Sequence, residues 1–215
     1  MTALGTSPPV VYQLRVVLRG ISPLIWRRLL VGGTTTMAGL HDVLQVAFGW
    51  PGDHLHCFKV HGREYGLHYD GGPFFRDDAR QVRLGGLGLR VGERFVYDYD
   101  LGALWRHDLR VEQITDPEPG RAYPRCTGGR RAGPPENCGG PEAFMHASQP
   151  YRLFEVMDKV TEIIDEIVDD VSALDDRYEE LVCLRPWLLT ERFDRRALNK
   201  ALAVLGEGAK NGTAA

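Results

Sequence analysis

Hydrophobic and polar residues alternate in several short segments of the first 115 residues. In the first of these segments, Leu14, Val16 and Leu18 alternate with Gln13 and Arg15. A period of two is typical of a β-strand that buries one face. Alternation and turn residues together predict strands over residues 12–18, 25–31, 54–60, 64–67, 94–100 and 106–115. The third and fourth strands, and likewise the fifth and sixth, are expected to pair as hairpins. The glycine-rich residues 69–92 predict a loop with one short element.

Helical periodicity replaces alternation in three places. Met37, Leu40 and Leu44 predict a helix that ends before Pro51. Residues 195–205 predict the last helix. Between them lies a heptad seam that predicts one long helix, or two helices broken near Ser172. Its members are Met157, Val160, Ile164, Ile167, Val171, Leu174, Tyr178 and Leu181.

The heptad segment is also strongly acidic. Ten carboxylates lie between Asp158 and Glu180, against only Lys159 and Arg177. An intramolecular partner with cations avoids repulsion between like charges, and the last helix offers Arg192, Arg195, Arg196 and Lys200. We therefore expect the seam to pack on that helix and on the sheet, which favours a monomer. A homodimer formed through residues 157–181 is the alternative.

Hairpins followed by helices predict the fold class and the domain organisation. The expected fold is α+β, with a largely antiparallel β-sheet, packed helices and a helical C-terminal region. One domain is expected over residues 10–205, with residues 150–205 as a helical extension. Residues 1–9 and 206–215 are expected to be flexible tails.

Composition places the chain among ordinary water-soluble proteins. It has 215 residues, 43% hydrophobic and 26% charged, with a net charge of −3. No global positive field therefore attracts nucleic acid, although a local basic face would fit this composition. No apolar run has the length of a signal peptide or a membrane span, so we expect a cytoplasmic protein with no membrane contact. Its thiols are then expected to be reduced, and Cys57 and Cys183 to be buried.

Residues 123–143 are rich in glycine and proline, which predicts neither a helix nor a central strand but an ordered loop. Cys126 and Cys138, twelve positions apart, could join a histidine in a metal site, form a disulfide, or pack as free thiols. Arg125, Arg130 and Arg131 are candidates for contact with phosphate or nucleic acid, because guanidinium groups bind phosphate well.

Histidines supply the remaining candidates for a metal site. His54 and His56 are two positions apart on a predicted strand and would share one face. His107 is predicted to point inward on a neighbouring hairpin. Together with Cys126 and Cys138 they are candidate ligands for zinc or another divalent metal.

The hairpin over residues 94–115 carries a second candidate constellation. Asp98 and Asp100 would share a strand face opposite His107, with Trp105 beside them. A carboxylate that orients an imidazole is an arrangement used in acid–base catalysis. The alternative is a polar cluster that only fixes the hairpin.

Several stretches together resemble the plasmid pRiA4b ORF-3-like family, over residues 11–145 and 193–202. The resemblance implies an α+β domain with a largely antiparallel sheet, and no settled activity. Ala103 and Gly133 stand where the family often has a carboxylate and a cysteine. The matching stretches are Ile21-Ser22-Pro23, Ile25-Trp26-Arg27-Arg28, Leu40-His41, Ala47-Phe48-Gly49-Trp50, His54-Leu55-His56, YDYDLGALWRH from Tyr97, Tyr123-Pro124, Pro134-Pro135-Glu136-Asn137-Cys138-Gly139-Gly140, and Phe193-Asp194 with Asn199.

Three functions follow as hypotheses. The first is an accessory or binding module, associated with plasmids or mobile elements, that has no assigned catalysis. The second is a metal-dependent hydrolase or nuclease built around His54, His56, Asp98, Asp100 and His107. The third is a nucleic-acid-binding accessory protein that uses the arginines of residues 123–143. The expected partner is accordingly a protein or a nucleic acid.

Overall fold

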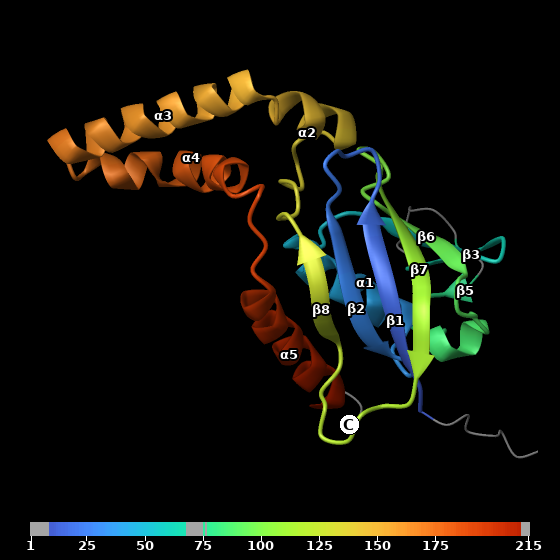
Figure 1. The fold of residues 1–215 in the computed structure, drawn as a ribbon. Coiled ribbons are helices and arrows are strands. Elements are labelled where there is room, and N and C mark those ends of the chain that lie inside the picture. The colour runs from blue at the N-terminus through green and yellow to red at the C-terminus, as the bar shows by residue number, and fades with distance from the viewer. Residues whose placement is uncertain (1–8, 68–74, 76, 212–215) are drawn as a thin grey trace, which may run out of the picture.

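The computed structural model describes residues 9–67, 75 and 77–211, and its centre is an eight-stranded sheet (Figure 1). The strand order is β5-β4-β3-β6-β7-β1-β2-β8, and every neighbouring pair is antiparallel except β4 with β5. The sheet confirms the predicted α+β class. The strands are β1 (Val11–Leu18), β2 (Trp26–Gly32), β3 (His56–Val60), β4 (Arg63–Gly66), β5 (Asp77–Asp78), β6 (Arg94–Tyr99), β7 (Trp105–Thr115) and β8 (Arg125–Arg130).

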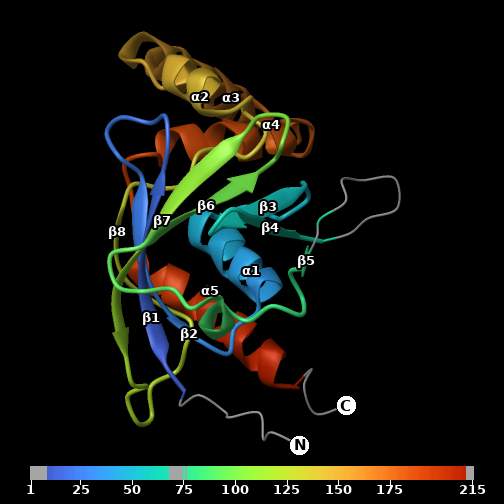
Figure 2. The ribbon, with the colours of Figure 1, turned by 90° about the vertical axis from the view of Figure 1, so that its right-hand side faces the viewer.

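Helices cover one face of the sheet and extend beyond one end of it. They are α1 (Met37–Phe48), η1 (Leu84–Leu87, a 3-10 helix), α2 (Pro141–Ala147), α3 (Pro150–Asp169), α4 (Ala173–Leu188) and α5 (Arg195–Asn211). Helix α1 lies behind the sheet in Figure 1, and α5 packs on both β8 and α1. Figure 2 shows the opposite side of β1, β2 and β8 without a covering helix.

Alternation along the strands builds the core as predicted. Val16 lies opposite Leu109 across β1 and β7, and Phe95 lies opposite Leu109 across β6 and β7. All three side chains are buried, as are Leu14 and Val111. Because side chains alternate between the two faces of a strand, the intervening polar residues fall on the open face.

The ends of α1 are set by local chemistry. The Thr36 side chain accepts a hydrogen bond from the Gly39 N–H at 3.0 Å, which satisfies a donor that has no partner within the helix. Gly49 ends the helix at φ +77°, a conformation that glycine adopts without steric cost. At the same end, the buried Arg27 side chain donates to the Ala47 carbonyl at 2.8 Å and joins α1 to β2.

The prediction of a continuous loop over residues 123–143 is wrong in two places. Residues 125–130 form the edge strand β8, and residues 141–147 form α2. An edge strand tolerates glycine, and here the glycines permit close packing. A Cβ atom on Gly129 would lie 2.6 Å from the Phe193 ring, so the missing side chain lets this ring lie directly on the strand.

The heptad segment forms two helices, as one of the two alternatives proposed, with the break at residues 170–172. Its predicted packing is wrong. Helices α3 and α4 pack on each other as a hairpin that projects away from the sheet (Figure 1), whereas α5 packs on β8 and α1. The physical reason is that α5 already lies against β8 and α1, so the acidic segment finds its cations within the hairpin. There, Arg177 pairs with Glu166 at 2.9 Å.

Several smaller expectations are settled by the same structure. Cys57 is buried as predicted, but Cys183 is exposed on α4. Helix α5 continues through residues 206–211, which were expected to be a tail, while residues 1–8 and 212–215 lie outside the described residues. Within the described part of the chain, no helix is both long and apolar enough to cross a membrane.

Candidate functional site

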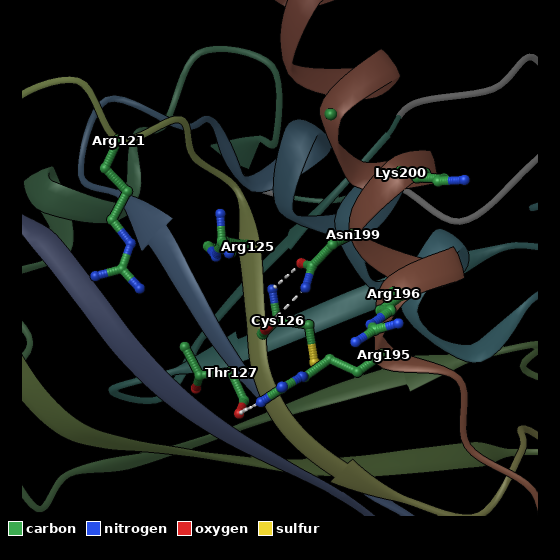
Figure 3. Close-up of a pocket in the computed structure, with 9 residues that line it drawn as sticks. Arg121, Arg125, Cys126, Thr127, Arg195, Arg196, Asn199 and Lys200 are labelled. Atoms are coloured by element: carbon green, nitrogen blue, oxygen red, sulfur yellow. Dashed lines mark hydrogen bonds between the residues drawn. The ribbon is translucent and has the colours of Figure 1, made fainter.

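A groove between β8 and α5 collects the cations of three chain segments (Figure 3). Its volume is about 710 Å³. Among the residues that the structure describes, no carboxylate lines it, and five of the nine lining residues are basic. The lining residues are Arg121, Arg125, Cys126, Thr127, Arg195, Arg196, Asn199, Lys200 and Ala203.

Asn199 docks α5 onto the free edge of β8. Its Oδ1 accepts a hydrogen bond from the Cys126 N–H at 2.8 Å, and its Nδ2 donates to the Cys126 carbonyl at 3.0 Å. The amide therefore replaces the neighbouring strand that an edge strand lacks. Arg195 adds a hydrogen bond from Nη1 to the Thr127 carbonyl at 3.1 Å. These contacts fix the distance between the two walls of the groove.

Carboxylates of the protein neutralise little of the positive charge of the groove. Arg121 pairs with Glu118, which lies just outside the lining. Among the described residues, Arg125, Arg196 and Lys200 form no ion pair with a carboxylate. All three are exposed, so they remain hydrated when no ligand is bound. Like charges in one concave site repel one another, and an anion relieves that repulsion.

The beginning of α5 adds to this field. The Asp194 side chain caps the helix by accepting hydrogen bonds from the N–H groups of Arg196 and Ala197, both at 2.9 Å. Arg195 and Arg196 occupy the first turn of α5, where cations are unfavourable because the helix dipole is positive there. Arginines at the positive end of the helix dipole destabilise the folded protein. The same arrangement favours the binding of an anionic ligand.

The three predicted phosphate-binding arginines separate in the structure. Arg125 lines the groove. Arg130 is exposed at the end of β8 and does not line it. Arg131 is structural, because it is 4% exposed, donates to the Pro23 carbonyl at 2.6 Å and pairs with Glu191 at 2.7 Å.

The other four cations of the groove were missed as binding residues. Arg195, Arg196 and Lys200 had been assigned to the acidic segment, and Arg121 had not been considered. The available signal was the helical spacing of residues 195, 196, 199, 200 and 203, which places them on one side of α5. Only the fold brings that side onto β8.

The predicted polar cluster of Asp98, Asp100, Trp105 and His107 does not form. Asp98 lies opposite Arg106 on the open face and bonds to it at 2.7 and 2.9 Å, whereas His107 belongs to the covered face. Burial alone would raise the pKa of Asp98, but hydrogen bonds from Arg106 and Lys59 outweigh it and lower the pKa. Asp100 instead caps the turn by accepting from the Gly102 N–H at 3.2 Å. The Trp105 indole N–H donates to the Glu136 carbonyl at 3.1 Å.

The predicted metal ligands also lie apart. His54 precedes β3, is half-buried and contacts Asn137 Oδ1 at 3.0 Å, so it does not share a face with the buried His56. Cys126 lies in β8, and Cys126 and Cys138 are both free thiols, without the proposed disulfide. No cluster of three or more His, Cys, Asp or Glu suited to a metal occurs in the described ranges.

His56 and His107 belong instead to a buried aromatic cluster beneath α1. His56 stacks on His41 with ring centroids 3.7 Å apart, and His41 Nδ1 lies 2.6 Å from the Tyr97 hydroxyl. Burial lowers the pKa of His41 to about 3, of His56 to about 4 and of His107 to about 3. The imidazoles are therefore neutral near pH 7 and pack like small aromatic rings. The roles of His41 and Tyr97 were missed by sequence reasoning.

The fold and the groove define a class of protein: an α+β domain with an open, largely antiparallel sheet and a basic groove beside its edge strand. The chain belongs to the plasmid pRiA4b ORF-3-like protein family, whose model matches residues 10–197. The match therefore runs through the α3–α4 hairpin, beyond the stretches that carry the resemblance in the sequence.

Two relatives extend this assignment. The chain is similar to Uncharacterized protein y4hQ of Sinorhizobium fredii (strain NBRC 101917 / NGR234), with 36% identity over 138 residues, which are 62% of this chain and 69% of that protein. It is also similar to the crystal structure of the protein of unknown function MM3350 from Methanosarcina mazei Go1. The TM-score is 0.64 and the identity 27%, covering 89% of this chain and 98% of that one. These descriptions name neither catalysis nor a specific binding role.

Proposed function

We propose that this protein is a nucleic-acid-binding accessory module whose groove between β8 and α5 contacts the phosphate backbone. The observation that carries the proposal is the set of five cations, without a carboxylate, that line one groove of about 710 Å³. Four of the five are arginines, whose planar guanidinium groups match phosphate oxygens in a bidentate manner.

A polyanion fits this groove better than a single small phosphate ligand. Arg196 and Lys200 lie one helical turn apart, about 6 Å along α5, and Arg121 and Arg125 line the opposite wall. The cations are therefore spread along the groove rather than focused on one point. A chain of phosphates can neutralise several of them at once and release the counterions that it carried, which drives association.

The lining also suggests what the groove would not recognise. It contains no aromatic side chain on which a base could stack, and the Asn199 amide is already bonded to the Cys126 backbone. Hydrogen bonds to base edges are what give sequence specificity, while phosphate contacts only position the ligand. We therefore expect binding that is largely independent of sequence.

The proposed function also includes a cellular location and an association with plasmids or mobile elements. The matching family takes its description from a plasmid reading frame, which is in keeping with a role beside the DNA of plasmids or mobile elements. Four free cysteines are in keeping with the reducing cytoplasm, where such DNA is found. Because the candidate catalytic residues lie apart, we propose binding rather than hydrolysis.

The experiment compares two triple variants with equal loss of charge. The groove variant carries Arg125→Gln, Arg196→Gln and Lys200→Gln. The control variant carries Arg63→Gln, Arg80→Gln and Arg90→Gln, which are exposed and do not line the groove. Binding to labelled single-stranded and duplex oligonucleotides of several sequences is measured by fluorescence anisotropy at low salt.

We expect the groove variant to lose at least about tenfold in affinity, since each removed phosphate contact weakens binding. The control variant should stay within about threefold of the wild type. Equal losses in the two variants would mean that net charge alone drives binding. Absence of binding by the wild type at low salt would refute the proposed function.

A further inference from the structure

The α3–α4 hairpin leaves apolar side chains exposed on both of its helices. On α3, Ile163 is fully buried against α4, whereas its neighbour Ile164 is 50% exposed. Leu153, Met157 and Val168 are also exposed, and together with Ile164 they are separated by four, seven and four residues. Such spacing places them in one stripe along the helix. The apolar stripe of α3 thus extends beyond the part that α4 covers.

Helix α4 repeats this arrangement. Leu174, Tyr178 and Val182 are spaced by four residues and are all at least 42% exposed. The side of α4 that faces α3 instead carries Arg177 and Glu180, which form ion pairs with Glu166 and Lys159. The contact within the hairpin is therefore partly ionic, and much of the apolar surface of α4 points elsewhere.

The two exposed stripes lie on the same side of the hairpin. On each helix, the centre of the exposed stripe lies about a quarter of a turn around the helix axis from the side that contacts the other helix. Viewed from the N-terminus to the C-terminus, the direction of this rotation is the same for α3 and α4. Because the helices run antiparallel, these two rotations bring both stripes to one side. The outer edge and far side carry exposed carboxylates instead, namely Asp158, Glu162, Asp165, Asp169, Asp176 and Glu179. We call the side without these carboxylates the apolar face, defined by Leu153, Met157, Ile164, Val168, Leu174, Tyr178 and Val182.

We propose that a second copy of this chain covers the apolar face, so that two hairpins form a four-helix bundle. A two-fold pairing suits a face that is flat, apolar and free of carboxylates, because it leaves the acidic sides of both copies in water. Within the described part of the chain, α5, which the sequence suggested as the partner of this segment, is already engaged because it packs on β8 and α1.

The size of the apolar face suits a dimer. Helix α3 has 20 residues, which gives a length of about 30 Å. Two helices side by side are about 20 Å wide. The face then measures on the order of 600 Å² per copy, or about 1,200 Å² per dimer, which reaches the lower end of specific interfaces. This dimer is independent of the proposed ligand of the groove.

Two neighbouring residues supply matched variants for the test. Ile164→Asp places a charge on the apolar face, and Ile163→Asp places the same charge between α3 and α4. Oligomeric state is measured by analytical ultracentrifugation of the purified full chain at micromolar concentration, and helix content by circular dichroism. We expect a dimeric wild type, a folded monomer with Ile164→Asp, and a loss of helix content with Ile163→Asp.

Val168→Lys keeps the test decisive if Ile164→Asp fails to fold. Val168 is 75% exposed, so a lysine there leaves the hairpin itself intact and should also yield a monomer. A monomeric wild type would overturn the proposal and would assign the apolar face to a different protein. A dimer that survives both Ile164→Asp and Val168→Lys would overturn it as well, because the interface would then lie elsewhere.

Discussion

The sheet with α1 and α5, and the α3–α4 hairpin, are built from similar apolar side chains but cover them differently. In the sheet, Leu109 and Val16 are buried by strands on both sides and by the helices above. Among the hairpin side chains that the structure describes, Ile163 alone reaches the same degree of burial. The charges follow the opposite arrangement, with a basic groove on the sheet and carboxylates on the hairpin. The comparison shows that the sheet region buries its apolar side chains within the chain, whereas the hairpin leaves many of its own exposed, which motivates the proposed dimer.

The largest expected effect separates the two regions by stability. Leu109→Ala should lower the free energy of unfolding by about 2–5 kcal/mol, because it removes fully buried methyl groups and leaves a cavity. Val168→Ala, on the exposed side of α3, should cost less than about 0.5 kcal/mol when the protein is dilute enough to be monomeric. Urea titration followed by circular dichroism measures both. Equal costs would remove the distinction between core and hairpin.

A second prediction concerns the buried histidines, which belong to the sheet region alone. His41, His56 and His107 have lowered pKa values in the folded protein, whereas unfolded histidines titrate near 6.5. As pH falls below 6.5, the unfolded chain therefore binds protons that the folded chain cannot. The contribution of these three histidines to stability should be constant above pH 7 and should fall between about pH 6.5 and 5, by about 1–2 kcal/mol for each histidine.

The variant His56→Phe tests the assignment of this pH dependence. Phenylalanine keeps a ring beside His41 and removes two buried nitrogens that have no partner, so the loss between pH 6.5 and 5 should shrink by about 1–2 kcal/mol. His54→Gln is the control. A hydrogen bond to Asn137 raises the pKa of His54. His54 therefore contributes stability that is present below pH 6.5 and is lost as pH rises, which is opposite in sign to the contribution of His56. An unchanged pH profile in His56→Phe would contradict the assignment.

A third prediction concerns the junction between the two regions. Arg131 pairs with Glu191 in the segment that follows α4, and the Ala132 N–H donates to the Thr190 carbonyl at 3.0 Å nearby. Arg131→Gln should cost about 1–3 kcal/mol, since it removes the buried charged donor that bonds to the Pro23 carbonyl and to Glu191. Arg125→Gln, in the same stretch of sequence but exposed in the groove, should stay within about 0.5 kcal/mol. A comparable loss in both variants would show that Arg125 is structural too.

Sequence reasoning predicts the sheet region well and the hairpin only in part. Alternation around Leu14, Val16 and Leu109 reports directly on burial, because one face of each strand is always covered. The heptad seam predicts α3 and α4, but the same spacing suits packing on the sheet, on α4 or on another chain. Nothing local distinguishes these partners, and the one chosen from the sequence was wrong.

The candidate site was harder to predict for a different physical reason. The groove joins Arg125 to Arg196 and Lys200, which are about 70 residues apart in the chain, and their proximity depends on the Asn199 contact with β8. Spacing rules describe neighbours on one element and cannot reveal such a pairing. The predicted arrangement of His54 with His56 does not form, because β3 begins at His56 and not at His54. The predicted arrangement of Asp98 with His107 does not form, because the two side chains lie on opposite faces of the sheet.

The measurement that tests the proposed function most directly is the salt dependence of binding to duplex DNA. The logarithm of the association constant of the wild type is plotted against the logarithm of salt concentration from about 50 to 200 mM. If the five cations of the groove contact phosphates, the slope should be about −4.5, and Arg125→Gln with Arg196→Gln and Lys200→Gln should make it shallower by about 2–3. A wild-type slope close to zero, or an identical slope in the groove variant, would contradict the assignment of the groove as a phosphate-binding surface.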